Sequence, residues 1–168
     1  MMSKDLTQAD AETAFWEALE KSNTGLLGLD KPGYHHQPMT AFRDGETGTI
    51  WFFSRNDTDL ARDVAGGNQP AMFCYGSKDQ KIWACIHGEL SAHGADRQII
   101  DKHWNPVLAA WYPEGKKDPH LTILRFEAGH GRIWVSDGGL AKFAYEIAKA
   151  NITKTTPDTG GVKDVNLG

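Results

Sequence analysis

Short β-prone segments separated by turn-forming residues are the feature that most constrains the fold of this chain. The pattern predicts strands over 24–29, 37–43, 48–54, 71–76 and 81–90, then two more over 121–127 and 132–136, joined by Ala-Gly-His-Gly. The intervening segments KPGYHHQP and RDGETG supply the Gly, Pro and Asp that tight turns use. We therefore expect antiparallel pairing in a sheet of about seven strands.

Helical periodicity is confined to a few segments. Apolar residues recur at helical spacing over 5–21, 95–104 and 140–150, and a short helix is expected after Asp57 or Thr58 as its cap. The helix over 140–150 should pack on the sheet through a stripe formed by Leu140, Phe143, Ala144, Ile147 and Ala148. Strands and helices do not alternate strictly, which favours a mainly β fold with flanking helices, an antiparallel barrel or α+β arrangement, over a doubly wound parallel sheet.

Composition narrows the classes of partner. The chain has 168 residues, enough for a single domain, placed here over 1–150 with a C-terminal tail over 151–168 that is a mobile end or an arm laid across a neighbour. Its 18 Lys and Arg against 22 Asp and Glu give a net charge of −4, which argues against binding to nucleic acid or an anionic membrane. Without a signal-like N-terminus or a long apolar run, a cytoplasmic, soluble protein is expected.

Several common kinds of site are not indicated. Cys74 and Cys85 lie in separate apolar stretches without a C-x-x-C pattern, so they are expected to be buried thiols. His35 and His36 point to opposite faces of an extended chain and have no ligand at metal-binding spacing, so no metal is expected. The motifs for dinucleotides, P-loop phosphates, zinc proteases and serine hydrolases are missing from the sequence.

Two segments have residue types that suit a phosphorylated ligand. The strand over 37–43 is interrupted by Thr40 and ends in Arg43, so it can offer main-chain groups, a hydroxyl and a cation; an ordinary edge strand is the alternative. Ser54 and Arg55 lie where a strand ends and a helix begins, an arrangement that suits a phosphate. Asp57 and Asp59 would repel an anion, so an ordinary capped helix is the alternative there.

Other candidates are weaker. Lys78 lies in a polar turn and supplies a cation that the fold has to bring to the site. Trp104 and Trp111 are candidates for stacking on a planar ligand, for a dimer seam or for filling the core. His87 and His103 are candidates for proton transfer, with a structural role as the alternative.

Three motifs together carry a family resemblance: PMTAF over 38–42, IWFFSRNDTDL over 50–60 and WNPVLAAWYPEGKKDP over 104–119. From about residue 11 to about residue 147 the chain resembles the general-stress-protein branch of the pyridoxamine 5'-phosphate oxidase-like family. The resemblance implies an FMN-binding split β-barrel of six antiparallel strands. It also implies a homodimer that holds two FMN molecules at the subunit interface.

The resemblance also implies positions for the cofactor. Pro38, Met39, Thr40 and Ala41 would run beside the isoalloxazine ring, with their main chain contacting its polar edge. Phe53, Ser54 and Arg55 would lie toward the ribityl phosphate.

One position departs from the family pattern. Leu60 occupies the place where many relatives have a lysine that meets the phosphate. The resemblance then implies that the main-chain amides of Asp59 and Leu60 bind the phosphate. The positive charge that the lysine would supply has to come from Arg43, Arg55, Arg62 or Lys78. Trp111 belongs to the most specific of the three motifs.

The function implied is that of an FMN-dependent oxidoreductase acting on a small redox partner such as NAD(P)H or a quinone. No side chain stands out as a catalytic acid or base, so a non-catalytic flavin store or sensor is the alternative. FAD, a deazaflavin and haem are the alternatives to FMN. The R-x-V-L-x-K strand of true pyridoxamine phosphate oxidases is missing, so oxidation of pyridoxamine phosphate is not expected.

Overall fold

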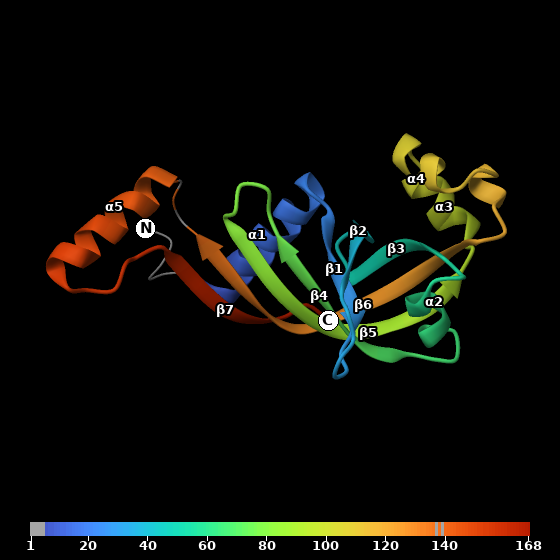
Figure 1. Ribbon diagram of the computed structural model, residues 1–168, viewed down its shortest axis with the longest axis horizontal. Coiled ribbons are helices and arrows are strands. Elements are labelled where there is room, and N and C mark those ends of the chain that lie inside the picture. The colour runs from blue at the N-terminus through green and yellow to red at the C-terminus, as the bar shows by residue number, and fades with distance from the viewer. Residues whose placement is uncertain (1–5, 137, 139) are drawn as a thin grey trace.

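The computed structural model, which describes residues 6–136, 138 and 140–168, is built on a seven-stranded antiparallel sheet. The spatial order of the strands is β3-β2-β1-β4-β5-β6-β7, and β3 also pairs with β6, which closes β1 to β6 into a six-stranded barrel (Figure 1). The six-stranded antiparallel barrel that the family resemblance implies is therefore confirmed. The strands are β1 (Thr24–Leu29), β2 (Gln37–Arg43), β3 (Thr49–Arg55), β4 (Gln69–Gly76), β5 (Ile82–Gly94), β6 (Leu121–Ser136) and β7 (Gly160–Asn166).

Strand β6 is one continuous strand, so the predicted turn at Ala-Gly-His-Gly is wrong. The glycines serve close strand approach instead of a turn. A Cβ at Gly131 would lie 2.6 Å from the main-chain oxygen of Cys85 on β5, and the β5–β6 register shifts between Ile86 and Gly88. Glycine and a bulge let the strand bend here without ending.

The two halves of β6 pair with different strands along the same edge. Leu121–Glu127 pair with β3, and His130–Ser136 pair with β7. The predicted tail therefore contributes a strand to the sheet. Its low apolar content fits an edge strand of which a single residue, Val165, is buried in the core.

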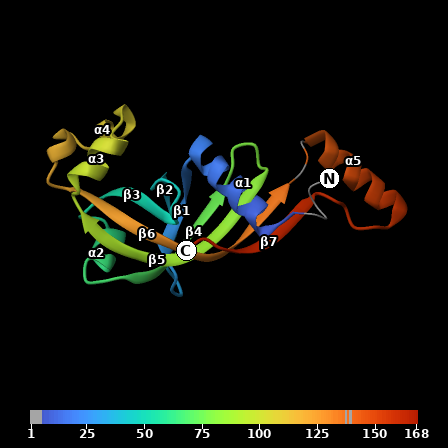
Figure 2. The ribbon, with the colours of Figure 1, turned by 180° about the vertical axis from the view of Figure 1, so that it is seen from behind.

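Helix α1 (Gln8–Lys21) lies across the barrel (Figure 2). Thr7 caps it in a capping box with Asp10, whereas Asp5, where the predicted helix starts, lies outside the described residues. Phe15 and Leu19 of this helix join the interior core, whose largest members also include Phe52, Phe73 and Phe126 from the strands.

A second apolar cluster lies outside the barrel wall. Helices α3 (Arg97–His103) and α4 (Pro106–Trp111) cover the outer side of β3, burying Trp51 and Phe53 against Ile100 and Leu108. Because both faces of β3 are covered, almost every residue of this strand is buried. The remaining helical segments are α2 (Asp59–Val64), capped by Thr58, and a 3₁₀ turn at Gly115–Lys117.

Helix α4 was missed from the sequence. Asn105-Pro106 ends α3 as predicted, but it also begins α4: the Asn105 side chain accepts hydrogen bonds from the N–H groups of Val107 and Leu108, and Pro106 occupies the first turn. Proline fits there because the first N–H groups of a helix lack intrahelical partners.

Helix α5 (Leu140–Thr153) projects from one end of the barrel (Figure 1). The helix was predicted correctly, but its packing was not. Phe143, Ala144, Ile147 and Ala148 of the predicted stripe are exposed, while the Leu140 side chain lies outside the described part of the chain. Among the described helices, none is long and apolar enough to cross a membrane.

The close approach of β5 and β6 predicts a test of the fold. A methyl group at Gly88 would touch the main-chain oxygen of Glu127 and lie 2.8 Å from the Phe126 ring. We expect Gly88→Ala to lower the free energy of unfolding by about 1–3 kcal/mol in urea titrations, the usual cost of overpacking. Gly66→Ala is the matched control, because open space surrounds Gly66. Equal urea midpoints for the two variants would contradict this packing.

Candidate functional site

The barrel opens between β2 and β3. Paired residues join these strands only from Ala41 to Arg43 on β2, opposite Phe52 to Ile50 on β3. The N-terminal half of β2 pairs with β1 instead, from Gln37 to Thr40. Beyond Ala41 the two strands therefore separate and leave a split in the barrel wall.

The main chain of β2 alternates between the two sides of this split. The Ala41 N–H donates to the main-chain oxygen of Asn23, toward β1, at 2.7 Å. Successive residues of an antiparallel strand direct their main-chain groups to opposite neighbours. The main-chain groups of Thr40 and Pro38 therefore face the split.

Side chains on β2 follow the complementary alternation. Ala41 is buried and Met39 packs against the interior core, so their side chains point into the barrel. Those of Pro38, Thr40 and Phe42 point outward, by the period of two of a strand. A ligand in the split would meet β2 through its main chain and the Thr40 hydroxyl.

The end of β3 and the turn into α2 place hydroxyl groups at one edge of the split. The Ser54 and Thr58 side-chain oxygens lie 3.3 Å apart, and both donate to the main-chain oxygen of Arg55. Arg55 itself makes a two-bond pair with Asp57, at 3.0 and 2.8 Å. Hydrogen bonding to the Arg55 guanidinium lowers the pKa of the Asp57 carboxyl, so the pair is ionised at neutral pH.

Leu60 supplies no charge to this edge. Its side chain is 2% exposed and belongs to the interior core. Asp59 is paired with Arg62 at 3.7 Å on the exposed side of α2. The first helical bond runs from the Arg62 N–H to the Thr58 oxygen, so the N–H groups of Asp59 and Leu60 precede it and point out of the helix start.

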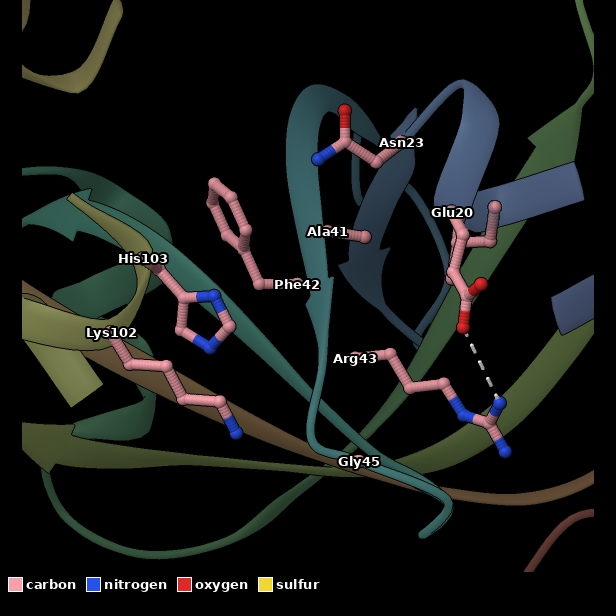
Figure 3. Close-up of a pocket in the computed structure, with 9 residues that line it drawn as sticks. Glu20, Asn23, Ala41, Phe42, Arg43, Gly45, Lys102 and His103 are labelled. Atoms are coloured by element: carbon pink, nitrogen blue, oxygen red, sulfur yellow. Dashed lines mark ion pairs between the residues drawn. The ribbon is translucent and has the colours of Figure 1, made fainter. Parts of the chain in front are cut away.

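A pocket of about 330 Å³ lies beyond the paired end of β2 (Figure 3). Arg43 occupies one side of it, where the guanidinium lies 4.1 Å from the centre of the Trp16 ring and 3.8 Å from the Glu20 carboxylate. Phe42 and His103 form the other side, with ring centres 4.9 Å apart. Arg43 is therefore held at the α1 side of the barrel, away from the end of β3.

His103 is the most unusual group of this pocket. Among the described residues its buried Nε2 has no hydrogen-bond partner. Burial, reinforced by the nearby Lys102 ammonium, lowers the pKa of the His103 imidazole. The His103 side chain that lines the pocket is therefore uncharged at pH 7.

The outer face of the barrel has a second, apolar hollow of about 550 Å³. Pro38 and Leu26 lie at one side of it, Cys74 and Cys85 along its floor, and Trp83 and Trp134 at the other side. The tryptophans are 50% and 41% exposed, high values for such large apolar side chains.

No sequence motif marks this surface. The pattern that indicates it is the alternation of apolar residues along β5, in which Ile82, Ala84 and Ile86 point inward. Trp83 and Cys85 between them must then face outward.

Lys78 and Trp111, like Arg43, lie apart from the split. Lys78 follows the end of β4, whereas α2 lies before its start, so about 25 Å of strand separates them at 3.3 Å per residue. Trp111 is 70% exposed at the end of α4. Within one chain the structure thus brings together Pro38, Met39, Thr40, Ala41, Phe53, Ser54, Arg55, Asp59 and Leu60 around the split, but not Lys78, Arg43 or Trp111.

Comparisons with known proteins agree with this architecture. The family model described as pyridoxamine 5'-phosphate oxidase like matches residues 10–158. The solved structure of a general stress protein 26 from Jannaschia is 39% identical and covers 94% of this chain and 99% of its own, with a TM-score of 0.81.

Further relatives extend the comparison. The general stress FMN/FAD binding protein from Xanthomonas citri is 37% identical over 79% of this chain and 93% of its own, with a TM-score of 0.72. Protein bli-3 of Neurospora crassa is 21% identical over 145 residues, which is 81% of this chain and 69% of that protein.

The lowered pKa of His103 predicts a pH dependence of stability. The folded protein binds this proton less readily than the unfolded chain, whose histidine pKa is 6.5, so stability falls as the pH drops through that value. Between about pH 7 and about pH 5 the native protein should lose more stability than His103→Leu, as followed by urea unfolding at each pH.

His35→Leu, which removes an exposed histidine, is the control and should behave as the native protein does. Parallel pH profiles for the native protein and His103→Leu would show that His103 is not held neutral by the fold.

Proposed function

The chain belongs to the pyridoxamine 5'-phosphate oxidase-like family, and on that premise we propose that it is an FMN-binding oxidoreductase that acts as a homodimer. The observation that carries the proposal is the split between β2 and β3, with main-chain groups of β2 facing into it. A 37% identical relative is named as an FMN/FAD binding protein, which supports a flavin as the occupant.

The residues around the split fit the two ends of such a cofactor. The Thr40 and Pro38 main chain offers hydrogen bonds to the polar edge of the ring system, and the Phe53 side chain supplies apolar contact nearby. The N–H groups of Asp59 and Leu60 offer donors for a phosphate, and the Ser54 and Thr58 hydroxyls can turn to it from the main-chain oxygen of Arg55.

Charge compensation for the phosphate falls to Arg55 in this proposal. Of the four cations considered, Arg43 is held by Trp16 and Glu20, Lys78 lies far along β4, and Arg62 points to the exposed side of α2. Arg55 adjoins both hydroxyl groups through its main-chain oxygen. Its pair with Asp57 is exposed, so exchanging that carboxylate for a phosphate costs little desolvation.

Exposed apolar surface supports the homodimer. Leu26, Trp83, Trp134 and Val162 lie on one outer face of the sheet and are 41–50% exposed. Trp83 is paired with Trp134, and Trp134 with Val162, so the patch is continuous across β5, β6 and β7. A contiguous apolar patch on a folded domain marks an interaction surface.

Helix α5 adds a second uncovered surface. Phe143, Ile147 and Ile152 are exposed on a helix that projects beyond the barrel (Figure 1). Phe143 shares a hollow of about 810 Å³ with Trp83 and Trp134. A second copy of the chain seated on the sheet face would cover both surfaces together, and it would border the split at Pro38.

No side chain assigned to the split among the described residues stands out as a catalytic acid or base. These side chains are the Thr40, Ser54 and Thr58 hydroxyls, the Phe53 ring and the ionised Arg55–Asp57 pair. When bound, the flavin supplies the transfer of hydride or single electrons. A flavin store or sensor without turnover is the alternative, because it needs the same binding residues.

The experiment is to purify the protein and identify its bound ligand by absorption spectrum and mass. Steady oxidation of NAD(P)H with an added quinone, dependent on the bound flavin, would support the oxidoreductase. Tight FMN binding without turnover would support the store or sensor. Bound FAD instead of FMN would show that the flavin is FAD. A haem or deazaflavin spectrum would show that the ligand is not a flavin nucleotide. A colourless protein that does not bind added FMN would overturn flavin binding.

A bulky side chain beside the split tests the position of the ring. We expect Thr40→Trp to lose flavin on gel filtration while keeping its circular dichroism spectrum, because the indole would fill the opening. Thr47→Trp is the control, since Thr47 is exposed in the β2–β3 turn. Unchanged FMN affinity in Thr40→Trp would place the ring elsewhere.

Charge reversal at Arg55 tests the phosphate end. Loss of charge-assisted hydrogen bonds should weaken FMN binding by about 10- to 100-fold, and riboflavin binding much less, in fluorescence titrations. Arg97→Glu, in an exposed pair with Asp101 on α3, is the matched control. Equal losses of FMN and riboflavin affinity in Arg55→Glu would remove Arg55 from this role.

A further inference from the structure

Two cysteines face each other on the outer wall of the barrel. Cys74 on β4 is the direct register partner of Cys85 on β5, and their sulfur atoms lie 3.5 Å apart. Both are free thiols and only partly buried, so the expectation of separate, buried thiols is wrong. The sequence could not show the pairing, because it depends on the β4–β5 register.

The hydrogen-bond pattern brings these side chains close. The Ser77 N–H donates to the main-chain oxygen of Ile82 at 2.9 Å, so Ser77 and Ile82 form a hydrogen-bonded pair. Pairs alternate along an antiparallel ladder. Three register steps from that pair, Cys74 and Cys85 therefore form a non-hydrogen-bonded pair, in which Cα atoms are about 4.5 Å apart.

That separation lies at the short end of the range that disulfides accept. Bridged cysteines have Cα atoms about 4.4–6.8 Å apart, so a bond between these sulfurs needs side-chain rotation and no rearrangement of the strands. Exposed disulfides are more easily reduced than buried structural ones, and these two sulfurs are only partly buried. The site is therefore suited to a reversible bond.

The surroundings leave room for an oxidant at the two sulfurs. They form the floor of the outer hollow of about 550 Å³. The proposed second chain would cover this hollow, so the oxidant enters when the two chains separate. Burial, together with the hydrogen bond to Cys85, raises the pKa of the Cys74 thiol to about 12.

We propose that Cys74 and Cys85 are a redox-active pair that closes to a disulfide within one chain when hydrogen peroxide oxidises it. One of the two sulfurs, as its thiolate, attacks one peroxide oxygen, the O–O bond breaks, and the other oxygen leaves as hydroxide, which takes up the proton that the thiol released. That cysteine is then a sulfenic acid.

The second thiol next attacks the sulfur of the sulfenic acid. The S–S bond forms, the S–O bond breaks, and the oxygen leaves with the proton of the second thiol as another water. Two electrons thus pass from the thiols to the peroxide. None of these steps involves the split between β2 and β3, so the pair is independent of the proposed flavin.

The test exposes the reduced, full-length protein to a small excess of hydrogen peroxide. The number of thiols that react with Ellman's reagent after denaturation should fall from two to none per chain. The intact mass should fall by two hydrogens, and dithiothreitol should restore both thiols. On a non-reducing gel the protein should remain a single chain.

Single variants test the sulfenic acid step. Cys74→Ser and Cys85→Ser each lack the second thiol, so neither should form a disulfide within the chain, and dimedone should label the sulfenic acid of at least one of them. The double variant provides the baseline, and circular dichroism checks each fold. Thiols of the native protein that survive the peroxide, or disulfides between chains, would overturn the proposal, and dimedone label in neither single variant would overturn the sulfenic acid step.

Discussion

The division of one edge of β6 between two partners is the constraint on which the rest of the structure depends. Its first half, Leu121–Glu127, holds β3 and closes the barrel, and its second half, His130–Ser136, holds β7. Strand β3 is thereby tied to β6 along its whole length, whereas β2 is tied to β3 only from Ala41 to Arg43. The wall opens where β2–β3 pairing ends, and the residues proposed to hold the flavin lie at that opening.

Much of this fold follows from local sequence patterns. β-prone segments bounded by turn-forming residues located the first five strands, and Thr58, one of the two residues expected as a cap, begins α2. The glycines of Ala-Gly-His-Gly were misleading, because glycine permits close approach of strands as well as turns. Thr40, Ser54 and Arg55 could be proposed from residue type and family resemblance. The inward position of Leu60 follows from the apolar spacing of the short helix, whereas the ion pair of Arg55 depends on the conformation of the turn between β3 and α2 and could not be proposed.

Surface features were the least predictable from sequence. The stripe of α5 is a sound helical signal, but periodicity shows only that a face is apolar and not which molecule covers it. The same applies to Trp83, Trp134 and the cysteine pair, which share one hollow because β4, β5 and β6 come into register there. In our account a second chain covers this face, so the dimer interface, the redox-active pair and one border of the split lie on the same side of the barrel.

The central claim is that two chains together hold a flavin in the split. Sedimentation velocity followed both by protein absorbance and by the visible absorbance of FMN tests it most directly. The account predicts that the FMN signal sediments with a species of twice the chain mass, at one FMN per chain. A species of single-chain mass, with all added FMN remaining at the rate of the free small molecule, would contradict it.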